Sequence, residues 1–241
     1  MTQGMTQGMR QGVTHRLALF ASGSGSNVQA ILDYQAALGA GAPFAPALVV
    51  TDRANAGVLA RAAAAGVPSV VLDAPADGPA MRALLDAHGI TLIALAGYLK
   101  FVPAEVTAQW RGTLLNVHPS LLPKFGGPGM YGHRVHQAVL AAGEHESGAT
   151  VHFVDDVYDG GAVIGRARVA VQSDDSTDAL AARVLRAEHA LYPRVVHAVA
   201  LGLVSLTPDG RAQLAPDLAH HTALLPSPVV LEFAPETPSH F

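Results

Sequence analysis

Asn116 and His118 are two residues whose types and spacing could take part in catalysis. Asn116 lies in an apolar run, Thr113–Val117, that predicts a strand, and His118 directly follows this run. Side chains two positions apart on a strand point to the same side. An amide can donate to a developing oxyanion, and an imidazole can carry a proton. The pair therefore suits acyl chemistry, although the same spacing is also typical of a strand end with a solvent-facing histidine.

Asp159 begins an Asp-Gly-Gly segment, which by itself most often marks a tight turn. If its carboxylate lay beside His118, the negative charge would favour the imidazolium and raise the pKa of the histidine above its reference value of about 6.5. A histidine tuned in this way can donate a proton near neutral pH. We therefore expect Asp159 to raise the pKa of His118, on the hypothesis that the two side chains meet.

A glycine- and serine-rich segment, Gly23–Asn27, follows a predicted strand at Leu17–Ser22 and precedes a helical pattern. Glycines let backbone amides approach an anion, and a helix start supplies free N–H groups. The segment lacks the third glycine of the dinucleotide fingerprint, because Val28 stands there, and it lacks the Gly-Lys ending of a Walker motif. It fits a phosphate monoester, or alternatively an ordinary turn in which Ser26 or Asn27 caps the helix.

Glu188 lies in a long predicted helix, roughly Thr177–Leu201, with mostly apolar neighbours three and four positions away. If it faces the core, its carboxylate needs a partner such as a substrate ammonium. A solvated glutamate beside Arg183 and Arg186 is equally consistent with the pattern.

The chain has 12 histidines and no cysteine, so a metal site would rest on imidazoles and carboxylates. His133 and His136 are three positions apart, but no His-Glu-x-x-His pattern accompanies them. We predict no metal, and we interpret His152 as a packed residue of a strand.

The elements that must position these residues alternate between short apolar runs and helical patterns. Strands are predicted at Leu17–Ser22, Ala47–Thr51, Ser69–Leu72, Thr91–Ala96 and Thr113–Val117. Helices are predicted around Val28–Leu32, at Ala56–Ala65, around Met81–Leu85 and at Pro103–Trp110. Such alternation predicts a single α/β domain with a mostly parallel, doubly wound, Rossmann-like sheet covered on both faces. Ligands of such a sheet bind outside the carboxyl ends of its strands, where the polar segments lie.

The second half of the chain predicts a hairpin-type strand pair, Ala149–Val154 and Val163–Val171, on either side of Asp159. The long helix follows, with Ser176 or Thr177 as its N-cap. We divide the chain into a loose leader (1–15), one folded domain (16–206) and a Pro-rich C-terminal tail without a clear period (207–241).

Composition excludes several broad classes of protein. The 241 residues are 50% hydrophobic, which excludes disorder as the main state. A net charge of −4 gives no attraction to nucleic acid or an anionic membrane, and no apolar run is long enough to span a bilayer. The leader lacks an apolar signal region, and the lack of cysteine fits a reducing compartment, so we expect a cytoplasmic protein.

In this order, the motifs resemble those of the phosphoribosylglycinamide formyltransferases, the folate-dependent enzymes of purine synthesis. The resemblance extends over about 16–204 and rests on the conjunction of six segments. They are Ser-Gly-x-Gly-Ser-Asn at 22–27, Leu-Ala-Gly-Tyr at 95–98, Leu-Asn-Val-His-Pro-Ser-Leu-Leu-Pro-Lys at 115–124, Gly-Ala-Thr-Val-His-Phe-Val at 148–154, Asp-Gly-Gly at 159–161 and Glu-His-Ala-Leu-Tyr-Pro at 188–193.

The resemblance implies transfer of the formyl group of 10-formyltetrahydrofolate, the co-substrate, to the amine of 5′-phosphoribosylglycinamide. It implies that Asn116 stabilises the oxyanion, that His118 is the general acid and that Asp159 raises its pKa. The residues that would hold the substrate phosphate and glycinamide are Gly25, Ser26, Asn27 and Glu188. Those that would line the folate site are Leu99, Lys100, Phe101, Val102 and Asn116. Partners would be small-molecule substrates only, and the protein a monomer or weak homodimer.

Three features depart from the family pattern. The stretch near Asp77–Arg82, where some relatives carry a further folate-contacting arginine, aligns poorly, and we carry over no such residue. Lys100 stands where many relatives carry arginine, which replaces a forked donor by a point charge. The glycine-rich segment 125–132 is longer than the corresponding link in some members, and its glycines suit a lid.

Other functions remain open on the sequence. A methionyl-tRNA formyltransferase would need a sizeable C-terminal domain and a basic surface, and a formyltetrahydrofolate hydrolase an additional N-terminal domain. We expect neither in this chain. A non-catalytic phosphate-binding module is a third alternative, which Asn116, His118 and Asp159 argue against.

Overall fold

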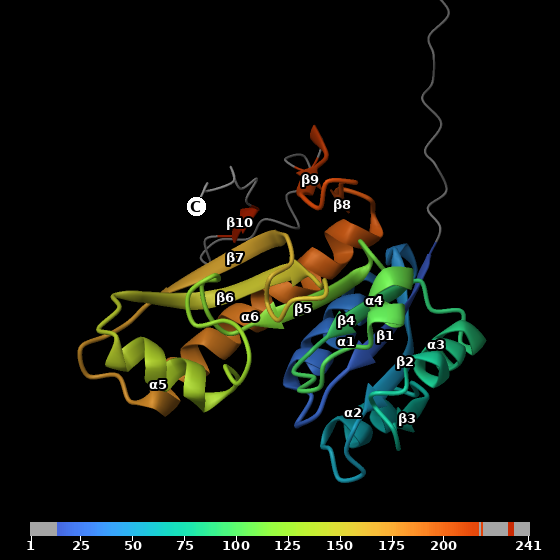
Figure 1. Ribbon diagram of the computed structural model, residues 1–241, viewed down its shortest axis with the longest axis horizontal. Helices are drawn as coiled ribbons and strands as arrows, with labels where there is room; N and C mark the ends of the chain where they lie inside the picture. Colours follow the sequence, from blue (N-terminus) through green and yellow to red (C-terminus); the bar gives the residue numbers. More distant parts are fainter. Residues whose placement is uncertain (1–13, 217, 219–230, 234–241) are drawn as a thin grey trace, which may run out of the picture.

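An eight-stranded sheet forms the centre of the fold (Figure 1). The computed structural model describes residues 14–216, 218 and 231–233, and the sheet is counted within these. In order across the sheet, the strands are β10 (Leu231–Phe233), β7 (Val163–Ala170), β6 (Glu146–Phe153), β5 (Leu114–His118), β4 (Leu92–Leu95), β1 (His15–Phe20), β2 (Phe44–Thr51) and β3 (Ser69–Val71).

The five strands β5, β4, β1, β2 and β3 are parallel. Beyond β5, the strands β6, β7 and β10 follow in that order, and each is antiparallel to the strand before it. The chain moves outward from β1 to β3 and then returns to β4 on the other side of β1. The strand order therefore reverses between β1 and β4, and a crevice opens there at the carboxyl ends. The predicted doubly wound sheet with a hairpin-type pair is confirmed.

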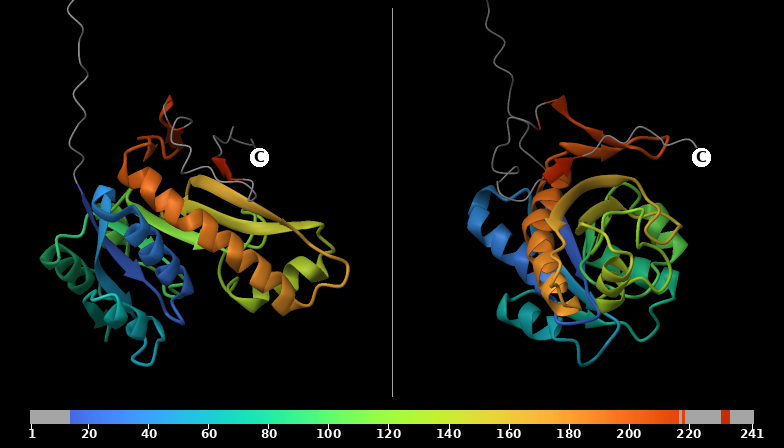
Figure 2. Two further views of the ribbon diagram at one scale, coloured as in Figure 1. Left: turned by 180° about the vertical axis from the view of Figure 1, so that it is seen from behind. Right: turned by 90° about the vertical axis from the view of Figure 1, so that its left-hand side faces the viewer.

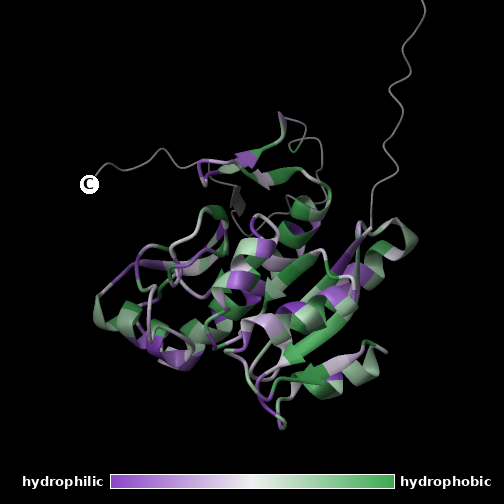
Figure 3. Ribbon diagram, turned by 45° about the vertical axis from the view of Figure 1, so that its right-hand side comes forward, coloured by the Kyte–Doolittle hydropathy of each residue, from purple (hydrophilic) through white to green (hydrophobic). Residues whose placement is uncertain are grey.

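Both faces of the sheet are covered, because the parallel strands are apolar on both sides. In β1, Leu17 and Leu19 pack on one side of the sheet, whereas Ala18 and Phe20 pack on the other. The first side holds α1 (Ser26–Leu38), α2 (Val58–Ala64) and α6 (Thr177–Ala200), and the second holds α3 (Gly78–Ala87) and α4 (Ala104–Gln109). Figure 2 shows α1 beside α6, and Figure 3 shows that the central strands are mostly hydrophobic.

The long helix α6 is fixed at its start and near its middle. Of the two predicted N-caps, Ser176 and Thr177, the structure has Ser176. Its hydroxyl accepts a 3.1 Å hydrogen bond from the backbone N–H of Ala179. Tyr192 is fully buried, and its hydroxyl lies 3.0 and 3.1 Å from the carbonyl oxygens of Leu95 and Leu115. One phenol thus joins α6 to the carboxyl end of β4 and to the neighbouring strand β5.

Several short elements were not expected from the sequence. A helix, α5 (His133–Ala141), follows the glycine-rich segment 125–132, and a 3₁₀ turn at Gly39–Gly41 follows α1. After α6, β8 (Val204–Leu206) and β9 (Ala212–Leu214) form an antiparallel pair. Together with β10, β9 places strands in the segment we interpreted as a tail.

The rest of the predicted tail, and residues 1–13 of the predicted leader, lie outside the described residues. Among the helices of the described part, none combines the length and apolar character that crossing a bilayer requires.

The start of α1 depends on Gly25, which has φ +73°. A Cβ atom at this position would lie 2.6 Å from the Val58 Cγ2 atom. At Gly23, two residues earlier, an added Cβ would meet nothing within 4 Å.

We predict that Gly25→Ala lowers the free energy of unfolding by about 1–3 kcal/mol, because an L-residue is strained in the left-handed region and the methyl group clashes with α2. Gly23→Ala, the matched control, should change it by less than about 0.5 kcal/mol. Thermal denaturation of both variants measures the difference, and equal midpoints would contradict the assignment.

Candidate active site

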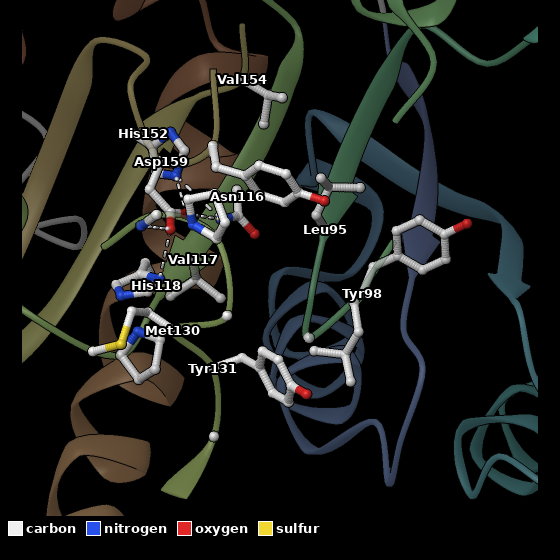
Figure 4. A pocket seen from close by; sticks show the side chains of 18 of the residues that line it. Leu95, Tyr98, Asn116, Val117, His118, Met130, Tyr131, His152, Val154 and Asp159 are labelled. Carbon is white, nitrogen blue, oxygen red and sulfur yellow. Dashed lines mark hydrogen bonds and ion pairs between the residues drawn. The ribbon is translucent and has the colours of Figure 1, made fainter. Parts of the chain in front are cut away.

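The carboxyl ends of β4 and β5 and the start of α1 meet at a cavity of about 580 Å³ (Figure 4). Nine residues that the sequence singled out line this cavity: Asn27, Leu99, Lys100, Phe101, Val102, Asn116, His118, Asp159 and Glu188. Gly25 and Ser26 adjoin Asn27 at the start of α1 but are not among the described residues that line it. The structure thus brings together side chains from five distant parts of the chain.

His118 ends β5, is only 4% exposed and has an oxygen atom near each ring nitrogen. Its Nδ1 lies 3.4 Å from Oδ2 of Asp159, and its Nε2 lies 2.8 Å from the carbonyl oxygen of Phe125. A carbonyl and a carboxylate can only accept hydrogen bonds. Both contacts are satisfied together only when both ring nitrogens carry hydrogen, so this geometry favours the imidazolium.

The net pKa shift of His118 is opposite to our expectation. Burial lowers the pKa of His118 because it removes water from the imidazolium, and the charge of Asp159 and the bond to Phe125 raise it by less. The charge of Asp159 does raise the pKa of His118, as the sequence argument held. The expected net direction was wrong because the extent of burial depends on the tertiary fold.

Asp159 is held by the backbone of two loops. It lies between β6 and β7 with φ +54°, and its Oδ2 atom accepts a 2.9 Å hydrogen bond from the Gly127 N–H. Burial raises the pKa of Asp159, but its contacts with His152, His118 and Gly127 together lower that pKa by more. The net pKa is therefore below the usual value. Asp159 is therefore an ionised carboxylate in a tight turn, so the segment carries both features that the sequence suggested.

Asn116 lies between two acceptors. Its side-chain nitrogen, Nδ2, is 3.1 Å from Nε2 of His152 and 3.4 Å from Oδ1 of Asp159. Figure 4 shows Asn116, His118 and Asp159 gathered at one wall of the cavity. An amide donor, an imidazole and a carboxylate therefore converge, as acyl chemistry requires.

Glu188 is buried, and its partner is Asn27. The Nδ2 atom of Asn27 donates a 2.5 Å hydrogen bond to Oε2 of Glu188, and the Oδ1 atom of Asn27 is buried without a partner among the described residues. Burial raises the pKa of Glu188 to about 7, against the opposing effect of the Asn27 bond. The solvated interpretation of Glu188 is therefore wrong.

The predicted phosphate loop has free backbone donors at the start of α1. Gly25, not Ser26 or Asn27, occupies the N-cap position, and no side chain caps the helix. The capping interpretation is thus contradicted. Arg61, which the sequence motifs did not identify, donates a 2.7 Å hydrogen bond from Nε to the carbonyl oxygen of Ser24 and places a cation beside the loop.

The opposite mouth of the cavity is apolar. Leu99 and Phe101 remain exposed although they are large and hydrophobic, and the ring of Phe101 lies 4.9 Å from that of Tyr158, centre to centre. Lys100, also exposed, lies between Leu99 and Phe101, and Val102 is buried below them. Such a surface suits a flat, largely aromatic ligand.

Three lining histidines, His133, His136 and His152, were not assigned to the site from the sequence. His136 on α5 is buried, and its pKa is lowered to about 4 by burial and by the neighbouring His133 and His118. His152 is packed in β6, as expected, but it also contacts Asn116 and Asp159. No group of three or more metal-ligating side chains is found in the part of the chain that the structure describes.

Comparisons with known proteins identify the family of this chain. A family model described as formyl transferase matches residues 15–196. A chloroplastic phosphoribosylglycinamide formyltransferase of Arabidopsis thaliana is 38% identical over 202 residues, which cover 81% of this chain and 68% of that protein. The phosphoribosylglycinamide formyltransferase of Haemophilus influenzae is 34% identical, with coverage of 85% and 92%.

Solved structures give the same result. The crystal structure of glycinamide ribonucleotide transformylase 1 from Symbiobacterium toebii matches with a TM-score of 0.76 at 34% identity, and covers 88% of this chain and 99% of that one. Some relatives are much longer: the chain spans 64% of the Vigna unguiculata enzyme and 15% of a trifunctional purine biosynthetic protein of Drosophila melanogaster.

The raised pKa of Glu188 predicts a pH dependence of stability. The carboxyl ionises near pH 4.5 when unfolded and near 7 when folded, so between these values the folded state holds one more proton. Its stabilising contribution is complete below about pH 4.5 and is lost as the pH rises through about 7. We predict that Glu188→Gln, which cannot ionise, gains on the order of 3 kcal/mol relative to the wild type between pH 4.5 and 8.

Urea denaturation at the two pH values measures this gain. Glu105→Gln, an exposed carboxyl on α4, is the control for the chemical change. Parallel pH profiles for the wild type and Glu188→Gln would show that Glu188 ionises normally.

Proposed function

The chain belongs to the formyl transferase family, and from this premise we propose that it transfers the formyl group of 10-formyltetrahydrofolate to the amine of 5′-phosphoribosylglycinamide in purine biosynthesis. The observation that carries the proposal is the convergence of Asn116, His118 and Asp159 at one wall of the cavity. Its volume of about 580 Å³ is within the usual range for small-molecule sites, about 300–1,000 Å³.

The phosphoribosylglycinamide would bind between the start of α1 and α6. The uncapped backbone amides at Gly25, Ser26 and Asn27 suit a phosphate, and the adjacent Arg61 adds positive charge. The side chain of Asn27 is engaged with Glu188, so we assign its contribution to the phosphate to its backbone N–H alone. Glu188 would accept hydrogen bonds from the glycinamide.

The folate would enter through the apolar mouth. Leu99, Phe101 and Val102 provide hydrophobic surface for its ring system, and Lys100 provides a positive charge for its carboxylates. A lysine ammonium attracts a carboxylate as a point charge, without the two-pronged geometry of arginine. In this pose the formyl group would lie beside Asn116, which lines the same cavity.

The reaction needs no nucleophilic side chain, because the substrate amine is the nucleophile. Its nitrogen bonds to the formyl carbon, the carbonyl electrons move to oxygen, and an N–H of Asn116 Nδ2 stabilises that oxygen. The His118 imidazolium donates its Nδ1 proton to the folate nitrogen as the carbon–nitrogen bond to the folate breaks. The attacking amine loses one proton, which restores the imidazolium, so protons balance over the cycle. No step calls on a metal ion.

Asp159 supports this cycle because its charge raises the pKa of His118, which burial lowers. Without the carboxylate, the pKa of His118 would be lowered further, and a smaller fraction of the rings would carry the proton that is donated. At 3.4 Å, the Nδ1 contact is long enough that the proton is not committed to Asp159.

A formyl-transfer assay with both substrates tests the proposal, with and without a chelator. We expect formylated glycinamide ribonucleotide and free tetrahydrofolate in equal amounts, unaffected by the chelator. Release of formate without formylated product would instead indicate a hydrolase, and substrate binding without turnover would indicate a binding module.

We predict that His118→Ala and Asp159→Asn each lower kcat by about 10²–10⁴-fold, because each removes part of the proton-donating pair. Thermal midpoints should change little. Asp156→Asn, an exposed neighbour in the same loop, is the control. Retention of wild-type turnover in either variant would remove the acid–base assignment.

The same pair predicts a shift of the pH profile. The charge of Asp159 raises the pKa of His118, so Asp159→Asn lowers that pKa still further. Because the protonated histidine is the active form, activity is lost as the pH rises through its pKa. We predict that the alkaline limb of kcat/KM moves to lower pH in Asp159→Asn, and an unmoved limb would show that another group is the essential acid.

A further inference from the structure

His152 is buried directly opposite the proposed oxyanion donor. It pairs with Asn116 in the β5–β6 register, is 2% exposed, and its Nε2 lies 3.1 Å from Nδ2 of Asn116. We propose that His152 is a positioning residue that sets the orientation of the Asn116 amide and so decides which amide atom meets the reacting oxygen. This inference deepens the proposed function and rests on it.

The backbone determines which nitrogen of His152 carries hydrogen. Its Nδ1 atom lies 2.7 Å from the carbonyl oxygen of Phe153, which can only accept. In the singly protonated ring, this contact places the hydrogen on Nδ1 and leaves Nε2 as the acceptor. The Oδ1 atom of Asp159 lies 3.6 Å from Nε2, which is beyond hydrogen-bond distance. The Phe153 carbonyl is itself confined, because a Cβ atom added at Gly161 would lie only 1.9 Å from its oxygen.

An acceptor at Nε2 requires a donor opposite, and this requirement orients the amide. With Nδ2 facing His152, one N–H is bound there and the second points toward Oδ1 of Asp159 at a long 3.4 Å. The second N–H is therefore available to a substrate oxygen. In the flipped amide, the Oδ1 atom of Asn116 would face two acceptors, and the site would lose its oxyanion donor.

Asp159 alone is a weaker orienting group. Its contact with Asn116 is longer than that of His152, and the same carboxylate also accepts from Gly127 and contacts His118. His152 makes its shorter contact from a fully packed strand, where its ring cannot turn away. The chain of contacts from Phe153 through His152 to Asn116 therefore holds the amide before substrate arrives.

Kinetics of His152 variants test this role. His152→Leu keeps an apolar side chain in the strand but removes the acceptor, whereas His152→Gln retains an oxygen acceptor near the position of Nε2. We expect kcat to fall about 10–100-fold in His152→Leu, with KM for both substrates within about twofold, and His152→Gln to recover most of kcat. Val151→Ala, a buried change on the opposite face of β6, should lower the thermal midpoint and leave kcat unchanged.

A double-mutant cycle shows whether His152 acts through Asn116. In an Asn116→Ala background, His152→Leu should cause no further loss of kcat, because no amide remains to be oriented. Multiplicative losses, or a His152→Gln variant as slow as His152→Leu, would overturn the proposal.

The ¹⁵N chemical shifts of the His152 ring supply a readout that does not depend on turnover. We expect the tautomer protonated at Nδ1, and the Nε2-protonated tautomer would overturn the inference whatever the activity. An inactive wild-type protein would refute the proposed function, and the tautomer would still decide whether His152 can orient the amide.

Discussion

The arrangement of the site depends on how the buried imidazole of His118 is held between two oxygen acceptors. One is the carboxylate of Asp159 and the other is the backbone carbonyl of Phe125. Both of these residues adopt left-handed backbone conformations, at φ +54° and +56°, which non-glycine residues rarely do. The conformations of these two loops place an oxygen atom near each ring nitrogen of His118, and both oxygens raise the pKa that burial lowers. The strand β5 places the ring between the two loops.

Much of the fold and part of the site followed from local patterns. Continuous apolar strands such as β1 could be recognised because both of their faces are buried, and the spacing of Asn116 and His118 placed them on one side of a strand. The N-cap of α6 could be narrowed to Ser176 or Thr177 because these residues directly precede a long helical pattern. The meeting of Asp159 with His118 was only a hypothesis, since no local pattern encodes a contact between distant loops.

Other features had no signature that side-chain types could carry. The Phe125 carbonyl and the Gly127 N–H are backbone groups that any residue supplies, so their role depends on loop conformation alone. His152 has the burial of an ordinary strand residue, and only its cross-strand partner reveals a second role. The helix α5 is only 9 residues long, and the lowered pKa of His118 reflects a degree of burial that only the assembled fold determines.

The hydrogen bond between Asn27 and Glu188 joins residues 161 positions apart, one on the first turn of α1 and the other within α6. If the substrate binds as proposed, a ligand group that draws Glu188 toward itself also acts on the helix start at which the phosphate would bind. Recognition of the two ends of one small molecule is therefore energetically linked. A fragment bearing only one end would forfeit this cooperativity, and its affinity would fall below what its own contacts provide.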